Sequence, residues 1–406
     1  MKWQRTFFAI WVGQAISLLG SQLVQFSLVW YLTSKTGSAS VLAMASFVAL
    51  LPQVILMPVS GILIDRWNRQ KVMMAADSII AAATAVLAVL FWKGAVQNWH
   101  IYAIMFIRSA AHGFHWPSML ASTSLMVPKD QLSRIAGINQ ALRGILGIAS
   151  PPAAALLIQS IPMQGILGLD IATAVAAILP LVFVRIPQPV RTERKEKEGL
   201  WQDFKFGLKY LYSWKGMLFL AIAAALLNFF IHPGYTFIPL LVTGHFQKGA
   251  WELSLIESAF SIGLVAGGIL LSLWGGFKSR IYTILLGVLG IAAGSLVIAA
   301  AAQAQFPLAL AGMAISGLMN PLTNGPLQAI IQAHTTPEVQ GRIFSLLESL
   351  ISLMMPVSML VAAPVAEHIG VRGWLVVGAA GCLAIGLAGI LIPSVRRIEQ
   401  GAGQRA

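Results

Sequence analysis

Charged side chains are rare inside the long apolar runs of this chain, and those that occur can carry chemistry. They are Asp77, Arg108, Arg143, Asp170, Glu257 and Glu348. A charge in an apolar surrounding is costly unless it is paired, so it is a functional candidate by default. We expect the Asp170 and Glu257 carboxylates to take up and release a proton, although Glu257 could instead reach the edge of its run. Arg143 could pair with a carboxylate or attract an anionic group. Asp77 and Glu348 lie near the ends of their runs, where structural roles are favoured.

A second charged cluster lies in a short turn between two apolar runs and reads GILIDRWNRQK. Gly61, its first residue, allows two helices to approach closely. Asp65 can pair with a cation or with the positive N-terminus of a helix. Arg66, Arg69 and Lys71 can reach carboxylates or anionic lipid headgroups. We interpret the five residues as a conformational latch; the alternative for the three basic residues is that they only anchor the turn at the water interface.

The sequence lacks the residue patterns that are characteristic of ATP binding, zinc binding and catalysis. There is no G-x-x-x-x-G-K-[ST] loop to cradle the phosphates of ATP. The histidines form no H-x-x-x-H pair or Cys/His cluster of the kind that binds zinc, and no catalytic set gathers near one end of the apolar runs. The single cysteine, Cys382, cannot form an intrachain disulfide. We expect no cofactor, no metal and no enzymatic activity.

The elements that must position these residues are membrane spans. The chain has 406 residues, of which 57% are hydrophobic and 10% charged, whereas a soluble domain carries roughly 25% charged residues. The first apolar run reaches Leu32 and is too long for a signal-peptide core. We therefore expect an all-α integral membrane protein with about twelve transmembrane helices, each of about 20 residues or more. Their expected ranges are 6–32, 40–64, 72–93, 99–123, 133–160, 163–185, 216–243, 252–275, 280–301, 306–332, 341–366 and 370–393. Pro321 and Pro326 are expected to interrupt the tenth.

These spans are expected to form two six-helix bundles, at residues 1–187 and 216–406. The only long polar segment, 188–215, lies between them and contains RTERKEKE followed by WQDFKFGLKYLYSW. We interpret it as a cytoplasmic linker with an interfacial amphipathic helix; a regulatory or lipid-binding role is the alternative.

The distribution of basic residues predicts the orientation. With an even number of spans, most of the 27 Lys and Arg residues fall on the side that holds both termini and segment 188–215. The opposite side holds Lys35, Lys93, Lys248 and Arg372. Basic loops stay in the cytoplasm, so we expect a multi-pass protein of the inner (cytoplasmic) membrane with both termini in the cytoplasm. The net charge of +13 then reflects topology, and no nucleic-acid partner is expected.

The two halves are related in sequence. WPSMLASTSLMVPKDQLSRIAGI, from Trp116, aligns with GPLQAIIQAHTTPEVQGRIFSLL, from Gly325. GILIDRWNRQK aligns with GILLSLWGGFK, from Gly268, which keeps the tryptophan and the lysine but has Ser272 in place of Asp65. A latch at this turn would therefore be one-sided. Duplication of a bundle is typical of transporters whose substrate site lies between repeats.

Three stretches resemble motifs of the major facilitator superfamily, and the resemblance covers nearly the whole chain. GILIDRWNRQK is similar to the loop motif G-x-L-x-D-R-x-x-R-x-K, and IRSAAHG, with Arg108 and Gly113, is similar to the fourth-helix motif R-x-x-x-x-G. ALRGILGIASPPAAAL is similar to the antiporter motif ending G-P-x-x-G-G, with Ser150, Ala154 and Ala155 in place of its glycines. The resemblance implies the major facilitator fold.

The fourth-helix motif also implies a part for Arg108 in proton coupling. Together with the residues discussed above, it completes the set that we expect to couple transport to protons: Arg108, Arg143, Asp170 and Glu257.

Within the superfamily, the chain resembles the bacterial Mef-type macrolide-efflux family. The similar stretches are AIWVGQAISLLGSQLVQFSLVWYLTSKTGSASVLAMAS, GRIFSLLESLISLMMPVS and the region around GGFKS. This resemblance implies export of an amphipathic, macrolide-like drug by proton antiport with alternating access. Export of a siderophore or another metabolite, lipid translocation, and uptake in place of export remain open. The implied partners are a small amphipathic molecule, protons and membrane lipids, and we expect a monomer.

The fold implied by the resemblance places the first, fourth, seventh and tenth helices around a substrate cavity. A large apolar drug needs aromatic walls with a few polar groups. The expected cavity residues are Gln25, Phe26, Trp30, His112, Trp116, Asn228, Tyr235, Asn320 and Asn324. Further expected contacts are Gln14, His115, Phe229, His232 and Gln328.

Overall fold

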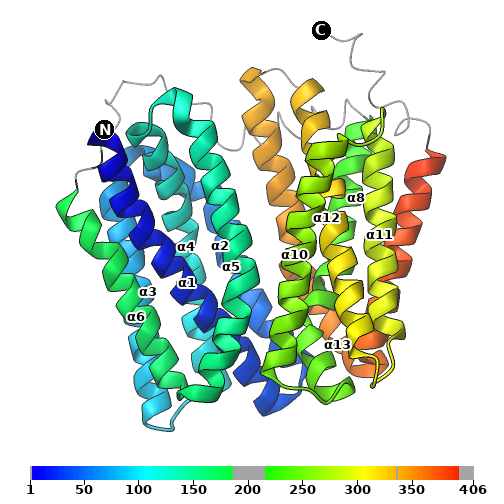
Figure 1. The fold of residues 1–406 in the computed structure, drawn as a ribbon, viewed down its shortest axis with the longest axis horizontal. Coiled ribbons are helices and arrows are strands. Elements are labelled where there is room, and N and C mark those ends of the chain that lie inside the picture. Colours follow the sequence, from blue (N-terminus) through cyan, green and yellow to red (C-terminus); the bar gives the residue numbers. More distant parts are fainter. Residues whose placement is uncertain (1, 185, 187–214, 335–336, 393–406) are drawn as a thin grey trace. The chain divides into compact units, whose positions relative to one another are not determined.

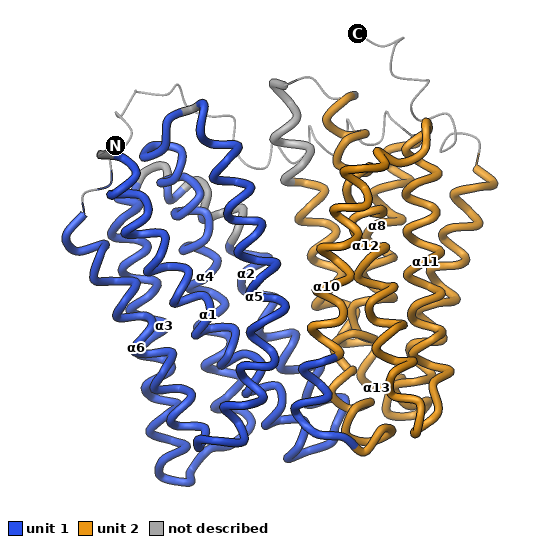
Figure 2. Tube along the Cα trace, in the orientation of Figure 1, with its two compact units in different colours: residues 1–192, 248–255 blue, residues 193–247, 256–406 orange. Residues whose placement is uncertain are grey.

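The computed structural model describes residues 2–184, 186, 215–334 and 337–392, and every regular element in these ranges is helical. The chain divides into two compact units (Figure 2). Unit 1 comprises residues 1–192 and 248–255, and unit 2 comprises residues 193–247 and 256–406. The predicted linker and interfacial helix lie outside the described residues, apart from Lys215.

Unit 1 is built from long helices and a short 3-10 turn, η1 (Figure 1). They are α1 Lys2–Thr36, α2 Ala39–Arg66, α3 Arg69–Trp92, α4 Asn98–Met126, η1 Lys129–Gln131, α5 Leu132–Ser160 and α6 Met163–Phe183. Helix α1 packs against α5 and α6, α2 against α4, and α3 against α4 and α6. At the start of α3, Asn68 Oδ1 accepts a hydrogen bond from Lys71 N at 3.1 Å. This cap satisfies a backbone N–H that the first helical turn leaves without a partner, so α3 begins directly after the charged turn.

Unit 2 contains the remaining helices. They are α8 Lys215–Thr236, α9 Ile238–Leu240, the π-helical turn η2 Leu241–His245, α10 Ala250–Trp274, α11 Arg280–Ala300, α12 Phe306–His334 and α13 Pro337–Leu391. Helix α10 begins in the segment assigned to unit 1. Helix α11 packs against α12 and α13, and α8 packs against α13. The seventh span, expected at 216–243, therefore ends as a regular α-helix at Thr236 and continues as short turns.

The expected interruption of the tenth span is wrong, because α12 runs through Pro321 and Pro326 as one helix. Proline is tolerated in membrane helices where other groups satisfy the freed backbone. Beside the two prolines, Thr323 Oγ1 donates to Met319 O at 3.2 Å, and Asn324 Nδ2 donates to Asn320 O at 3.2 Å. The carbonyls that lose a helical N–H are those of Gly317 and Leu322, four residues before each proline, so these bonds do not replace the lost ones; each proline removes a single backbone bond from a long helix.

Helix α13 consists of two helices joined at Gly370. This residue has φ 74° and ψ 166°, a conformation that glycine adopts at little cost. Ten stretches of the described residues are long and apolar enough to cross a membrane, and one of them, Leu346–Leu391, includes Gly370. The expected all-helical membrane protein is confirmed, while the total of twelve crossings stays a prediction.

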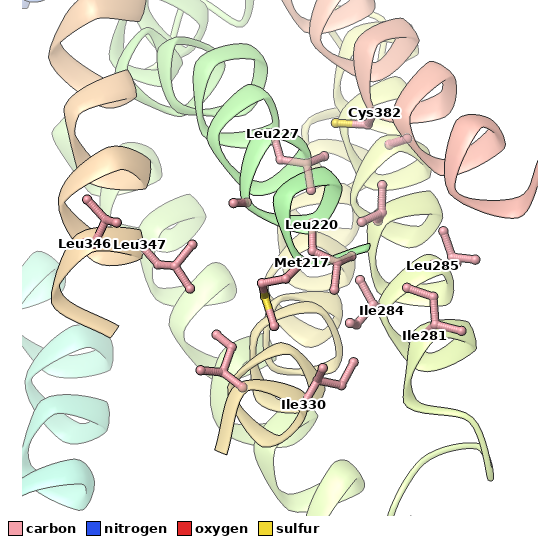
Figure 3. Packing of buried hydrophobic residues seen from close by; sticks show 14 of the residues in the cluster. Met217, Leu220, Leu227, Ile281, Ile284, Leu285, Ile330, Leu346, Leu347 and Cys382 are labelled. Atoms are coloured by element: carbon pink, nitrogen blue, oxygen red, sulfur yellow. The ribbon is translucent and has the colours of Figure 1, made fainter. Parts of the chain in front are cut away.

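Each unit has its own apolar core. In unit 1, residues near one end of α1, α3 and α6 meet, with Phe7, Ile10, Met73 and Leu181 all fully buried. In unit 2, the core gathers side chains from α8, α11, α12 and both parts of α13 (Figure 3). The members labelled in Figure 3 are Met217, Leu220, Leu227, Ile281, Ile284, Leu285, Ile330, Leu346, Leu347 and Cys382.

Candidate functional site

A buried ion pair joins α4 to α6 in unit 1. Arg108 Nη1 lies 2.5 Å from Asp170 Oδ2, with the arginine side chain 12% exposed and the aspartate 1%. Two charges can be removed from water together only when geometry and additional hydrogen bonds compensate for lost hydration. The structure thus brings together two of the four residues expected to couple protons.

Hydroxyl groups from two further helices complete this site. Thr84 of α3 donates from Oγ1 to Asp170 Oδ2 at 3.1 Å and accepts a hydrogen bond from Arg108 Nη1. Ser21 of α1 donates from Oγ to Asp170 Oδ1 at 3.3 Å and accepts from Arg108 Nη2 at 3.2 Å. Arg108 and Asp170 thus join side chains from four helices, α1, α3, α4 and α6.

The approach of α1 to this site depends on Gly20. A Cβ at this position would overlap Thr173 Oγ1 and lie 3.2 Å from Asp170 Oδ1. The missing side chain lets α1 pack closely on α6, as small residues do between membrane helices. The neighbouring Ser21 can consequently reach both members of the ion pair.

A second buried carboxylate, Asp77, lies between α1 and α4. Gln14 Nε2 donates to Asp77 Oδ2 at 3.0 Å. His115 Nε2 lies 3.3 Å from Asp77 Oδ1, close enough for an ion pair when the imidazole is protonated, but not aligned as a hydrogen bond. Asp77 is 4% exposed. Gln14 and His115 were expected as cavity contacts, but in the structure they contact Asp77. These contacts agree with the structural role favoured for Asp77.

Further along α4, aromatic side chains lie next to a cationic one. The rings of His112 and His115 are stacked with centroids 6.4 Å apart. The guanidinium carbon of Arg143, on α5, lies 4.1 Å from the centroid of the Trp116 ring, within the range of a cation–π interaction. Arg143 is exposed and contacts this aromatic face, with no carboxylate partner among the described residues; its attraction for an anionic group stays a prediction.

The residues of the charged turn differ in what the structure describes. The side chains of Gly61, Asp65 and Arg66 lie outside the described residues. Arg69 is 7% exposed and donates from Nη1 to Ala121 O of α4 at 2.8 Å, whereas Lys71 is exposed. A latch role for the turn therefore stays a prediction, and Arg69 has in addition a contact that ties α3 to α4.

Unit 2 holds a cavity of about 450 Å³, within the range of small-molecule sites. Its walls come from α8, α10, α11, α12 and α13 and are mainly apolar. Several residues expected to contact substrate line it: Asn228, His232, Tyr235, Asn320, Asn324 and Gln328. The ring of Phe260 lies 5.5 Å from that of Tyr235 and forms part of the same wall. An apolar cavity with a few amides can bind a small amphipathic molecule.

The remaining residues expected at the site belong neither to the buried ion pair nor to the described lining of the cavity. Glu257 lies on α10, is partly buried, and makes no hydrogen bond or ion pair with the described residues of unit 2. On α1, Gln25 is exposed, Trp30 is partly buried, and Phe26 is 6% exposed. Phe229 neighbours the cavity residue Asn228 in sequence but does not line the cavity.

Sequence reasoning missed Ser21 and Thr84, because uncharged hydroxyls are common in membrane helices. The spacing of polar residues in the sequence could nevertheless have indicated them. Ser21 follows Gln14 by seven residues, and Thr84 follows Asp77 by seven, a spacing that keeps side chains on one helical face. Polar residues at this spacing in apolar helices indicate a face turned toward a buried polar site.

An all-helical membrane chain with charged groups buried between its helices has the features of a solute transporter. The sequence matches the Major Facilitator Superfamily over residues 10–358, and the chain belongs to this family of transporters.

Curated relatives extend this match along the chain. The chain is 34% identical over 397 residues to macrolide efflux protein A of Streptococcus pyogenes, covering 98% of both chains. It is 33% identical to macrolide efflux protein A of Enterococcus faecalis, covering 80% of this chain and all of the relative. It is 24% identical to the multidrug efflux pump Tap of Mycobacterium tuberculosis, over 94% of this chain and 91% of the pump.

Solved structures share the fold at low sequence identity. The nucleoside transporter NupG superposes with a TM-score of 0.75 at 15% identity, covering 96% of this chain and 99% of the transporter. A bacterial homologue of the iron transporter ferroportin, in an inward-facing state, also gives a TM-score of 0.75 at 15% identity, covering 95% and 98%. At such identities the likeness bears on the fold alone.

Proposed function

We propose that this protein exports an amphipathic, macrolide-like drug in exchange for protons, by alternating access, with both termini in the cytoplasm. The observation that carries the proposal is the 34% identity to macrolide efflux protein A over 98% of both chains. Similarity of this extent covers the helices that form the buried ion pair and those that form the cavity. The apolar cavity of unit 2, with its few amides, supports an amphipathic substrate.

The ion pair of unit 1 supports proton coupling. Protonation of Asp170 removes the negative charge that faces Arg108, and with it the attraction between α4 and α6. Ser21 and Thr84 bind the same carboxylate and would change partners in the same step. One proton thereby alters contacts among four helices, as an exchange of protons for substrate requires. Arg143 and Glu257 remain further proposed members of the coupling set.

The first experiment measures resistance to a panel of drugs in cells that overexpress the chain, with and without a protonophore. We expect resistance limited to macrolides, lost with the protonophore and lost in Asp170→Asn. Resistance that persists with the protonophore would contradict proton coupling. Resistance to none of the drugs would reject drug export and favour a siderophore, another metabolite or a lipid as substrate.

The latch proposal has its own test. Asp65→Asn keeps the size of the side chain and removes its charge, so we expect normal membrane insertion and expression but weaker export. Ser272→Ala, at the aligned position of the second half, is the matched control and should export normally. Unchanged export by Asp65→Asn would show that the carboxylate is not a latch.

A further inference from the structure

The cavity of unit 2 has an unbalanced charge. Among the described residues that line it, Glu348 is the only carboxylate, and none is lysine or arginine. Glu348 is exposed and makes no hydrogen bond or ion pair with the described residues. A carboxylate that is exposed at the wall of an apolar cavity, with no described partner, has its charge available for a ligand. Among the described residues, Glu348 therefore has no partner that would support the structural role expected from its sequence position.

Two amides of the same cavity also present acceptors. Asn228 Nδ2 donates to Ala224 O at 3.0 Å, and Asn324 Nδ2 donates to Asn320 O at 3.2 Å. A backbone carbonyl can only accept, so in each case the NH₂ group must face it. The side-chain oxygens of Asn228 and Asn324 are therefore the ends left to accept hydrogen bonds from a ligand.

The negative charge and the two acceptors complement one kind of ligand. An organic ammonium ion brings a positive charge opposite Glu348 and N–H donors for the two amide oxygens, whereas an organic anion would meet the like charge of Glu348. Charge-assisted hydrogen bonds are stronger than neutral ones, and an unfavourable like-charge contact adds discrimination. The apolar remainder of the wall accommodates hydrocarbon.

We propose that the cavity of unit 2 selects amphipathic organic cations, with Glu348 as the counter-charge and the amide oxygens of Asn228 and Asn324 as acceptors. This inference deepens the proposed export function by naming the charge of its substrates. It rests on that function only for the statement that the bound molecule is exported, because selective binding can be measured without transport.

The test uses purified full-length protein and two probes of nearly equal size and shape but opposite charge, tetraphenylphosphonium and tetraphenylborate. Equilibrium dialysis measures the affinity for each. We expect tighter binding of the cation by wild type and about a tenfold weaker affinity for the cation in Glu348→Gln, equivalent to about 1.4 kcal/mol. Binding of the anion should not weaken. Asp130→Asn changes net charge equally, but Asp130 lies on the exposed turn η1 of unit 1 and does not line the cavity; this variant should bind both probes as wild type does.

Two results would overturn the inference. One is equal affinity of wild type for the two probes, which needs no variant and so does not depend on folding. The other is unchanged affinity for the cation in a Glu348→Gln protein that elutes as wild type does in size-exclusion chromatography. Neither result bears on the drug panel. Failure of that panel with cation selectivity intact would reject the proposed function alone.

Discussion

In unit 1 two buried carboxylates, Asp170 and Asp77, each lie against a basic side chain and a polar neighbour. In unit 2 the cavity is mainly apolar with a few uncharged amides, and Glu348, the one carboxylate among its described lining residues, is exposed. The two halves share sequence motifs and helix order, yet their polar groups are used differently. Paired buried charges suit a proton-dependent change of contacts, whereas an open, mostly uncharged cavity suits variable ligands. Under the proposed function, coupling would therefore fall to unit 1 and substrate binding to unit 2.

The charged turn of unit 1 and the aligned turn of unit 2, which begins at Gly268, also differ in their use of charge. Arg69 of unit 1 is buried and bonded to α4, but the aligned Gly276 of unit 2 has φ 83°, a conformation suited to glycine. Helix contacts in unit 2 depend instead on glycines such as Gly267, whose missing side chain lets α10 lie against the backbone of Leu318 in α12. Charged contacts thus have a larger structural part in unit 1, and close backbone packing has a larger part in unit 2.

Asp170→Asn should have the largest effect, because it leaves Arg108 buried without its counter-charge. Breaking a buried pair from one side costs about 3 to 5 kcal/mol, and export should be lost. Thermal unfolding can be followed by the reaction of a thiol dye with Cys382, the single cysteine, which is buried. The matched control Glu348→Gln removes an exposed carboxylate and should shift stability by less than about 0.5 kcal/mol.

A double variant distinguishes the contribution of the Arg108–Asp170 pair to stability from its proposed role in proton coupling. Arg108→Met with Asp170→Leu replaces the pair by apolar side chains, which is often neutral for stability. We expect its melting temperature to recover toward that of wild type while export stays absent. Recovery of export as well would mean that the pair is only structural.

The packing of unit 2 can be broken at Gly267. Its Cβ would overlap the backbone of Leu318, so Gly267→Ala should destabilise by about 1 to 3 kcal/mol. The next residue is the control: a Cβ at Gly268 meets nothing within 4 Å, and Gly268→Ala should be neutral or stabilise by up to about 1 kcal/mol. Equal melting temperatures for the two variants would refute close α10–α12 packing.

Arg69→Ala tests the charged turn of unit 1. The loss of its 2.8 Å bond to Ala121 O should cost about 1.5 to 3 kcal/mol, as for hydrogen bonds from charged groups. Lys71→Ala, at an exposed position two residues later, should unfold at the wild-type temperature. A fall in export by Lys71→Ala without a change in melting would favour the latch role over anchoring.

The smallest effect on stability is expected at the amides of unit 2. Asn324 is exposed, and among the described residues its amide bonds only to Asn320, so Asn324→Ala should change stability by less than about 0.5 kcal/mol. Tetraphenylphosphonium has no N–H, so its affinity should not change, whereas an alkylammonium ion that carries an N–H should bind about threefold more weakly, since one acceptor is lost. A large drop in melting temperature would show that this amide is structural, and would weaken the contrast between the units.

Much of the helical framework could be predicted from the sequence. Long apolar runs and their polar breaks indicated most helices to within a few residues, as for 280–301 against α11 Arg280–Ala300. The continuity of α12 through its prolines was missed, because a helix continues through a proline where its packing allows it, and a pattern of hydropathy does not show packing. The conformation of Gly370 was likewise not predicted, although it lies at the start of an expected span.

The sequence by itself determined that this protein is an all-helical membrane protein of the Major Facilitator Superfamily, because hydropathy and motifs are properties of consecutive residues. It also identified Arg108 and Asp170 as isolated charges in apolar runs. Only the tertiary structure decided that these two meet, and that Ser21 and Thr84 join them, since the four residues come from different helices. The same holds for Glu348 and the amides of the cavity. Pairing depends on how helices pack, and packing is set by contacts between residues far apart in the chain.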